Sequence, residues 1–120
     1  MKLVVLMIEV EQPEGVSARK LVLETAKHNV LTAYSGEYGM KLLHRFPNVD
    51  LVVVHRYVDG DKAKGLIEQI KAHSPHMPIV LLSPDPNEDG FGANYVIPSH
   101  QPQMILELLE QSFNASTTNY

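Results

Sequence analysis

One histidine, two glutamates and one serine end or follow the most apolar stretches of this chain. They are His55, Glu9, Glu11 and Ser83. An imidazole can exchange a proton near neutral pH, and together with carboxylates it can bind zinc or manganese. A serine hydroxyl beside a histidine can act as a nucleophile. Each of these chemistries needs the side chains at one place, so the elements around them must bring them together.

Five short apolar runs are typical of β-strands and are rich in β-branched residues. The expected strands are Leu3–Ile8, Val30–Tyr34, Asp50–His55, Pro78–Ser83 and Asn94–Ile97. The first, third and fourth runs are almost continuously apolar, as expected of strands buried on both faces of a parallel sheet. Ligands of such sheets bind beyond the carboxyl ends of the strands. His55, at the end of the third run, is therefore expected near any functional site.

Segments with an apolar stripe alternate with these strands and predict four helices, Pro13–Lys27, Ser35–Arg45, Lys62–His73 and Pro102–Phe113. The residues expected to face the core are Ala18, Leu21, Val22, Thr25 and Ala26; Leu42, Leu43 and Phe46; Ala63, Leu66, Ile67 and Ile70; and Met104, Ile105, Leu108 and Leu109. The segment 84–90 holds two prolines and a glycine and has no apolar stripe, so no regular helix is expected there.

Length and composition indicate one domain, residues 1–113, followed by a polar tail, residues 114–120. The net charge is −4 and the ten Lys and Arg residues are dispersed, which argues against binding to nucleic acid. The first apolar run is far too short to cross a membrane, is interrupted by Glu9 and lacks a cleavage site. A cytoplasmic protein with no membrane association is therefore expected, and the absence of cysteine excludes thiolate chemistry.

The alternation of strands and helices predicts an α/β fold, a three-layer, doubly wound, flavodoxin-like sandwich around a five-stranded parallel sheet. Five stretches at matching spacing resemble the receiver domain of bacterial two-component response regulators. They are Val5–Glu9, Val30–Glu37, Asp50–His55, Pro78–Ser83 and Gly92–Pro98. The resemblance implies the strand order 2-1-3-4-5. Because the segment after Ser83 is short and contains prolines, the family's fourth helix is expected to be shortened or absent.

Receiver chemistry needs a carboxylate that forms an acyl phosphate, acidic residues for Mg²⁺, a Lys that balances charge, and a hydroxyl that binds the phosphoryl group. His55 stands at the position of the family's phosphoacceptor aspartate. Glu9, with Glu11 nearby, is what remains of the acidic pair. Ser83 matches the hydroxyl and Tyr95 matches the aromatic residue that moves with it, while the Lys after the fifth strand has no counterpart. The resemblance thus implies a vestigial phosphorylation site of these five residues.

These departures from the family pattern predict a pseudo-receiver that binds neither metal nor cofactor and is not an enzyme. An imidazole cannot form an aspartyl phosphate, and one carboxylate beside Val10 is a poor Mg²⁺ site. The expected function is phosphorylation-independent protein–protein interaction in bacterial signalling, with other signalling proteins as partners. Association into a homodimer stays open.

Several alternatives also stay open. One alternative is a small-ligand-binding or enzymatic flavodoxin-like protein that uses the cleft around His55, with His55 as acid, base or metal ligand. Phosphorylation on an unusual acceptor would fall to Asp59 or Asp61, since Asp50 lies at the other end of its strand, about 16 Å away. His55 is either a pH-sensitive partner of Glu9 or a neutral replacement bonded to a neighbour.

Two further groupings are weaker. A divalent metal at Glu9, Glu11 and His55 is disfavoured, because no short spacing imposes a coordination geometry on the three residues. The pair His73 and His76 is spaced like metal ligands, but Pro75 separates the two residues at a helix end. Both histidines are therefore expected to be structural or exposed to solvent.

Overall fold

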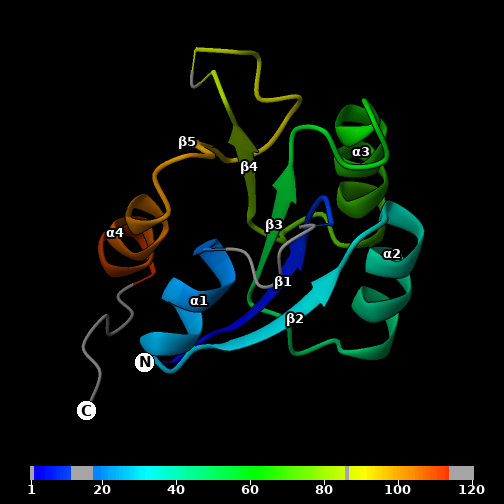
Figure 1. The fold of residues 1–120 in the computed structure, drawn as a ribbon. Helices are drawn as coiled ribbons and strands as arrows, with labels where there is room; N and C mark the ends of the chain where they lie inside the picture. The colour runs from blue at the N-terminus through cyan, green and yellow to red at the C-terminus, as the bar shows by residue number, and fades with distance from the viewer. Residues whose placement is uncertain (1, 12–17, 86, 114–120) are drawn as a thin grey trace.

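A five-stranded parallel sheet forms the centre of the molecule in the computed structural model, which describes residues 2–11, 18–85 and 87–113 (Figure 1). The strands are β1 (Val4–Ile8), β2 (Asn29–Ala33), β3 (Leu51–His55), β4 (Ile79–Ser83) and β5 (Tyr95–Pro98). Their order is β2-β1-β3-β4-β5, and every neighbouring pair is parallel. The predicted sheet and strand order are confirmed, with strand ends shifted by about one residue, as is usual for such boundaries.

In the described part of the chain, four helices cover the two faces of the sheet. They are α1 (Ala18–Thr25), α2 (Gly36–Arg45), α3 (Ala63–His73) and α4 (Gln103–Ser112). Helices α2 and α3 lie together on one face, and α1 and α4 lie together on the other (Figure 1). The three-layer arrangement is therefore as predicted. The predicted start of the first helix at Pro13 and the polar tail lie outside the described residues.

Alternation along the central strands sends side chains into two separate cores. In β1, Leu6 and Ile8 pack with α2 and α3, whereas Val5 and Met7 pack with α1 and α4. All five residues of β3 and all five of β4 are buried. This double burial is the reason why both strands are continuous apolar runs in the sequence.

The inward face of α1 differs from the prediction. Leu21, predicted to face the core, is 58% exposed, and Thr25 is also exposed. Leu23 is fully buried instead, together with the predicted Ala26. Residues two positions apart in an α-helix point about 200° away from each other around its axis, so Leu21 and Leu23 cannot share a face. Because residues 21–23 are all apolar, the sequence fits both stripes, and packing of Leu23 between the sheet and α4 selects the second.

The amino end of α2 is fixed by two side chains from outside the helix. Ser35 is the N-cap, and its hydroxyl accepts a hydrogen bond from the backbone N–H of Tyr38. Asp59, in the loop after β3, accepts the backbone N–H of Gly36 through Oδ2 at 2.8 Å. Helix starts leave four N–H groups without a partner in the helix, and two of them are satisfied here. The contact with Asp59 also ties α2 to the segment that leads into α3.

The connection from β4 to β5, residues 84–94, contains no helix among its described residues. The predicted absence of the family's fourth helix is confirmed in this part of the chain. Phe91 and Ala93 from this loop pack against the core on the α2–α3 face. Asn94 then closes the loop, because its side-chain oxygen accepts the N–H of Ile79 at 2.9 Å while its own N–H donates to the carbonyl of Ile79.

Candidate functional site

The carboxyl ends of three adjacent strands bring Glu9, His55 and Ser83 to one edge of the sheet. His55 ends β3, Ser83 ends β4, and Glu9 directly follows β1. Register agrees with this placement, since Ile8 pairs with Val54. Glu9 and Ser83 are at most 1% exposed and His55 is 9% exposed. Three of the predicted site residues therefore share one buried edge.

The other two predicted residues lie further out. Glu11 is exposed, two residues beyond Glu9. Tyr95 is the first residue of β5, whereas the strand residue beside Ser83 is Pro98. Three strand residues span about 10 Å, so the Tyr95 backbone is well removed from the level of Ser83. Its ring lies 6.2 Å from that of Phe113 and packs into the core beneath α4.

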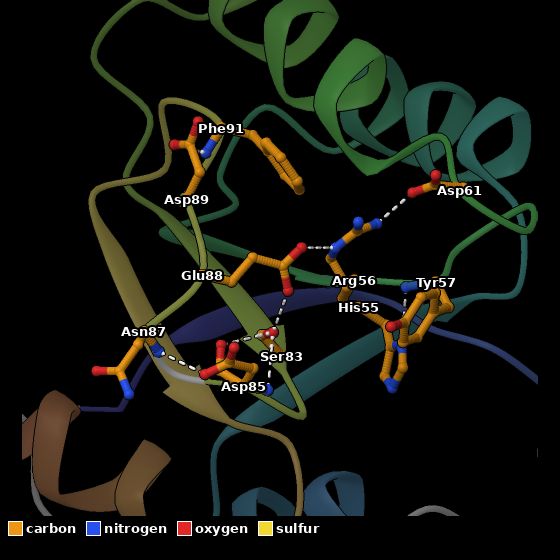
Figure 2. A network of polar contacts seen from close by, with 10 residues as sticks. All are labelled: His55, Arg56, Tyr57, Asp61, Ser83, Asp85, Asn87, Glu88, Asp89 and Phe91. Atoms are coloured by element: carbon orange, nitrogen blue, oxygen red, sulfur yellow. Dashed lines mark hydrogen bonds and ion pairs between the residues drawn. The ribbon is translucent and has the colours of Figure 1, made fainter.

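Ser83 is bound by a residue that the sequence analysis did not single out. Its hydroxyl lies 2.8 Å from Oε2 of Glu88 and 2.9 Å from the carbonyl of Asp85, and it accepts the Asp85 N–H at 3.2 Å. A hydroxyl has one proton to donate, and a carboxylate is the stronger acceptor of the two oxygens. The better donor geometry for the Ser83 hydroxyl is therefore toward Glu88, and Figure 2 shows the contact between the two side chains.

Arg56 neutralises the Glu88 carboxylate. Its Nε donates to Oε1 of Glu88, and its Nη1 pairs with Asp61. The guanidinium carbon lies 5.0 Å from the ring centre of Tyr57 and 4.8 Å from that of Phe91, within the range of cation–π contacts. Figure 2 shows Glu88 between Ser83 and Arg56. One cation, two carboxylates and two aromatic rings thus form a cluster at the end of β3.

The electrostatics of this cluster favour its charged form. The hydrogen bond from Arg56, followed by that from Ser83, holds the pKa of Glu88 below its ordinary value. The hydrogen bonds to Asp61 and Glu88 raise the pKa of the Arg56 guanidinium. Arg56 has only 15% of its side chain exposed and Glu88 has 23%, whereas the side chain of Asp61 is 76% exposed. Solvent therefore screens the Arg56–Asp61 pair more than the Arg56–Glu88 pair.

Local turns set the direction of the Glu88 side chain. The carboxylate of Asp85 accepts the N–H of Asn87, and the carboxylate of Asp89 accepts the N–H of Phe91, both at 3.0 Å. The N–H of Glu88 donates to the carbonyl of Asp85 at 3.1 Å. The first two are the hydrogen bonds with which aspartate side chains stabilise turns, and the third is a backbone turn bond. The acidic residues around Glu88 thus shape the loop that returns it over Ser83.

His55 makes a local contact with its own loop. Its Nδ1 accepts the backbone N–H of Tyr57 at 3.1 Å, and the two rings lie 6.2 Å apart. A neutral imidazole has one nitrogen that accepts and one that donates. The contact with Tyr57 therefore places the proton of the neutral ring on Nε2.

The aspartates that were considered as substitute acceptors make contacts elsewhere. Asp50 accepts the N–H of Val4 at the amino end of the sheet, which confirms that it lies opposite to His55. Asp59 is bound to the start of α2, and Asp61 is paired with Arg56. Among the described residues, no group of three or more His, Cys, Asp or Glu side chains could hold a metal ion. No helix in the same part of the chain is long and apolar enough to cross a membrane.

The contribution of Arg56 and Glu88 was missed in the sequence for a simple reason. The two residues are 32 positions apart, and no periodic pattern links a loop residue to the end of a distant strand. A weak signal was present, because Arg56 directly follows the strand that ends in His55, and the loop after Ser83 is rich in carboxylates. Adjacent parallel strands end at the same edge of the sheet, so the residue after β3 and the loop after β4 are expected to lie near each other.

The sequence matches no protein-family model and no curated protein, but solved structures share the fold. The CheX–CheY complex with BeF3 and Mg²⁺ from Borrelia burgdorferi matches with a TM-score of 0.79 at 17% identity, covering 92% of this chain and 89% of the other. A response regulator receiver domain from Clostridium thermocellum matches with a TM-score of 0.77 at 20% identity, covering 93% and 94%. The non-phosphorylated HemR receiver domain from Leptospira biflexa matches with a TM-score of 0.74 at 24% identity, covering 99% and 100%.

This chain therefore has the fold of response regulator receiver domains, a class of flavodoxin-like proteins with the strand order found here. Two groups occupy the carboxyl edge of its sheet. An imidazole ends β3, and a carboxylate from the chain itself is bound to the hydroxyl that ends β4.

Proposed function

We propose that this chain is a receiver-like signalling domain of a two-component system that lacks a phosphoacceptor aspartate and acts through phosphorylation-independent protein–protein contact. The observation that carries the proposal is the Glu88 carboxylate on the Ser83 hydroxyl, with Arg56 as its counter-ion. In receiver chemistry a hydroxyl at this strand end binds a phosphoryl oxygen, and a cation balances the added charge. Both contacts are already made within this chain.

The residues at the end of β3 support the same reading. Acyl phosphate formation needs a carboxylate nucleophile at the strand end, and His55 stands there. Glu88 brings one anionic group to the Ser83 hydroxyl without any phosphoryl donor. While the loop after β4 is closed, the chain itself then fills the site. Its output depends on the presence of the partner and not on a kinase.

An enzymatic or ligand-binding role for His55 has less support. The nitrogen of His55 that could accept a proton is the one that accepts the Tyr57 N–H. General base catalysis would have to break this hydrogen bond. The Ser83 hydroxyl faces the Glu88 carboxylate, so a serine nucleophile would also have to leave its present partner.

Three exposed tyrosines give the same edge of the molecule a surface suited to protein partners. Tyr34 directly follows β2, Tyr38 lies in the first turn of α2, and Tyr57 is two residues beyond β3. They are 47%, 51% and 46% exposed. Tyrosine is enriched in protein interfaces, because its large ring is apolar and its hydroxyl can still form hydrogen bonds. Another signalling protein is accordingly expected to contact these side chains.

The test is an amide NMR titration with Mg²⁺ and then beryllofluoride, an acyl-phosphate mimic, followed by incubation with acetyl phosphate and intact-mass measurement. A receiver domain known to accept phosphate serves as the positive control in the same buffers. We expect no saturable shifts at Glu9, Ser83 or the loop 84–94, and no phosphoryl adduct.

Saturable shifts at those residues, or a phosphoryl adduct, would overturn the proposal. Asp59→Asn and Asp61→Asn would then identify the acceptor, because only the variant that lacks the acceptor loses the response.

A further inference from the structure

Two exposed histidines from different helices meet at the opposite end of the molecule from Ser83. His44 lies in the last turn of α2 and His73 in the last turn of α3. Nε2 of His44 is 3.1 Å from Nδ1 of His73, and the ring centres are 4.1 Å apart at an interplanar angle of 80°. In the sequence, the spacing of His73 and His76 drew attention, but in the structure His73 contacts His44, 29 positions earlier.

Buried residues next to the two histidines fix the helix ends that carry them. Leu43, next to His44, and Ile70, one turn before His73, are buried in the same core. The backbones of both helix ends are therefore fixed, and only rotation of the exposed side chains is needed to adjust the ring nitrogens. Asp59 connects the amino end of α2 to the segment before α3, so a tie between the histidines would join the helix pair at its other end.

We propose that His44 and His73 form a two-histidine site for a first-row divalent cation of borderline softness, Cu²⁺, Ni²⁺ or Zn²⁺. Imidazole is a preferred ligand for these ions. With metal–nitrogen bonds of about 2.0–2.1 Å and a tetrahedral angle, two ligand nitrogens are about 3.3 Å apart. The observed 3.1 Å between the ring nitrogens is close to this spacing. Solvent reaches both rings, so water completes the coordination.

The electrostatic setting also favours a cation. Both histidines lie at helix carboxyl ends, where the aligned peptide dipoles present partial negative charge. Arg45 and Lys71 are the like charges in the same two turns. The ammonium of Lys71 lies 3.5 Å from the side-chain oxygen of Asn94, which draws it toward the β4–β5 loop.

The test is isothermal titration calorimetry of the tag-free protein with Zn²⁺ in a buffer that does not bind the ion. We expect one site that His44→Ala and His73→Ala each weaken by at least about tenfold, which corresponds to 1.4 kcal/mol. His76→Ala and His100→Ala, which remove other exposed histidines, serve as matched controls and should leave the affinity unchanged. His44→Gln repeats the test with a side chain that keeps polarity but has no imidazole.

A second measurement uses the unaltered protein. Sub-stoichiometric Cu²⁺ should broaden amide NMR signals at the ends of α2 and α3 before any others, since the broadening falls off steeply with distance from a paramagnetic ion. The proposal is overturned if the unaltered protein shows no Zn²⁺ binding, which would leave only an imidazole–imidazole hydrogen bond. It is equally overturned if His76→Ala weakens binding and His44→Ala does not, because the cation then binds within the turn after α3.

Discussion

Two glycines in neighbouring helices should respond in opposite directions to the same substitution. A Cβ at Gly39 in α2 would lie 2.5 Å from Cδ1 and 2.8 Å from Cγ1 of Ile8, a fully buried residue of β1. A Cβ at Gly65 in α3 would meet no atom within 4 Å. Alanine is favoured over glycine inside a helix by about 0.8–1 kcal/mol. Overpacking of a filled core costs about 1–3 kcal/mol.

Gly65→Ala is therefore expected to raise the free energy of unfolding by up to about 1 kcal/mol. In Gly39→Ala the helix gain is offset by the contact with Ile8, so the net change is a loss of roughly 0–2 kcal/mol. The two variants should then differ by about 1–3 kcal/mol, which corresponds to several degrees in Tm for a domain of this size.

Urea unfolding followed by far-ultraviolet circular dichroism measures both variants, with equal m-values as the condition for comparing midpoints. Gly65→Ala is the matched control, since it adds the same methyl group to a helix without a steric contact. Ile8 directly precedes Glu9, so amide shifts at Glu9 should report the displacement in Gly39→Ala. If Gly39→Ala stabilises the protein as much as Gly65→Ala does, the close packing of α2 on β1 is refuted.

Three further outcomes are expected. Leu23→Ala should destabilise the domain by about 2–5 kcal/mol and Leu21→Ala by less than about 0.5 kcal/mol, and equal midpoints in urea would contradict the observed face of α1. Because the pKa of Glu88 is lowered in the folded state, its contribution to stability is complete above the ordinary glutamate pKa of about 4.3 and is lost as pH falls through the lowered value. The native protein's stability advantage over Glu88→Gln, measured by urea unfolding, should therefore shrink as the pH falls. If the difference between their urea midpoints stays the same at every pH, the Arg56–Glu88 pair does not stabilise the fold. Asp59→Ala should cost about 0.5–2 kcal/mol in the same assay and shift the Gly36 amide, whereas an unmoved Gly36 signal would exclude the bond between them.

The sequence predicted those features that depend on local pattern. Strands such as β3 were readable because burial on both faces requires an apolar residue at nearly every position. Placement of Glu9, His55 and Ser83 at one edge followed from the parallel sheet, in which successive strands end on the same side. The core residues of α3 were identified correctly, because its apolar stripe fits a single helical face.

Features that depend on tertiary packing were not predictable in this way. The face of α1 was ambiguous because three consecutive apolar residues, 21–23, fit two stripes, and only contact with α4 and the sheet decides between them. The Ser83–Glu88–Arg56 contacts depend on the path of an irregular loop. The meeting of His44 and His73 depends on how two helices lie side by side, which their separate sequences do not specify.

The helix-free connection between β4 and β5 is expected to open more readily than the rest of the domain. Its described residues contribute Phe91 and Ala93 to the core, whereas a covering helix would add a whole apolar stripe. Segments with few buried apolar contacts open without global unfolding, at a lower free-energy cost. Glu88 lies on this loop, so the hydrogen bond between Ser83 and Glu88 is expected only in the closed form of the loop. A partner that binds residues 84–94 more tightly in the closed form would increase the closed population of the loop. Slower hydrogen exchange at the Glu88 amide would report this increase.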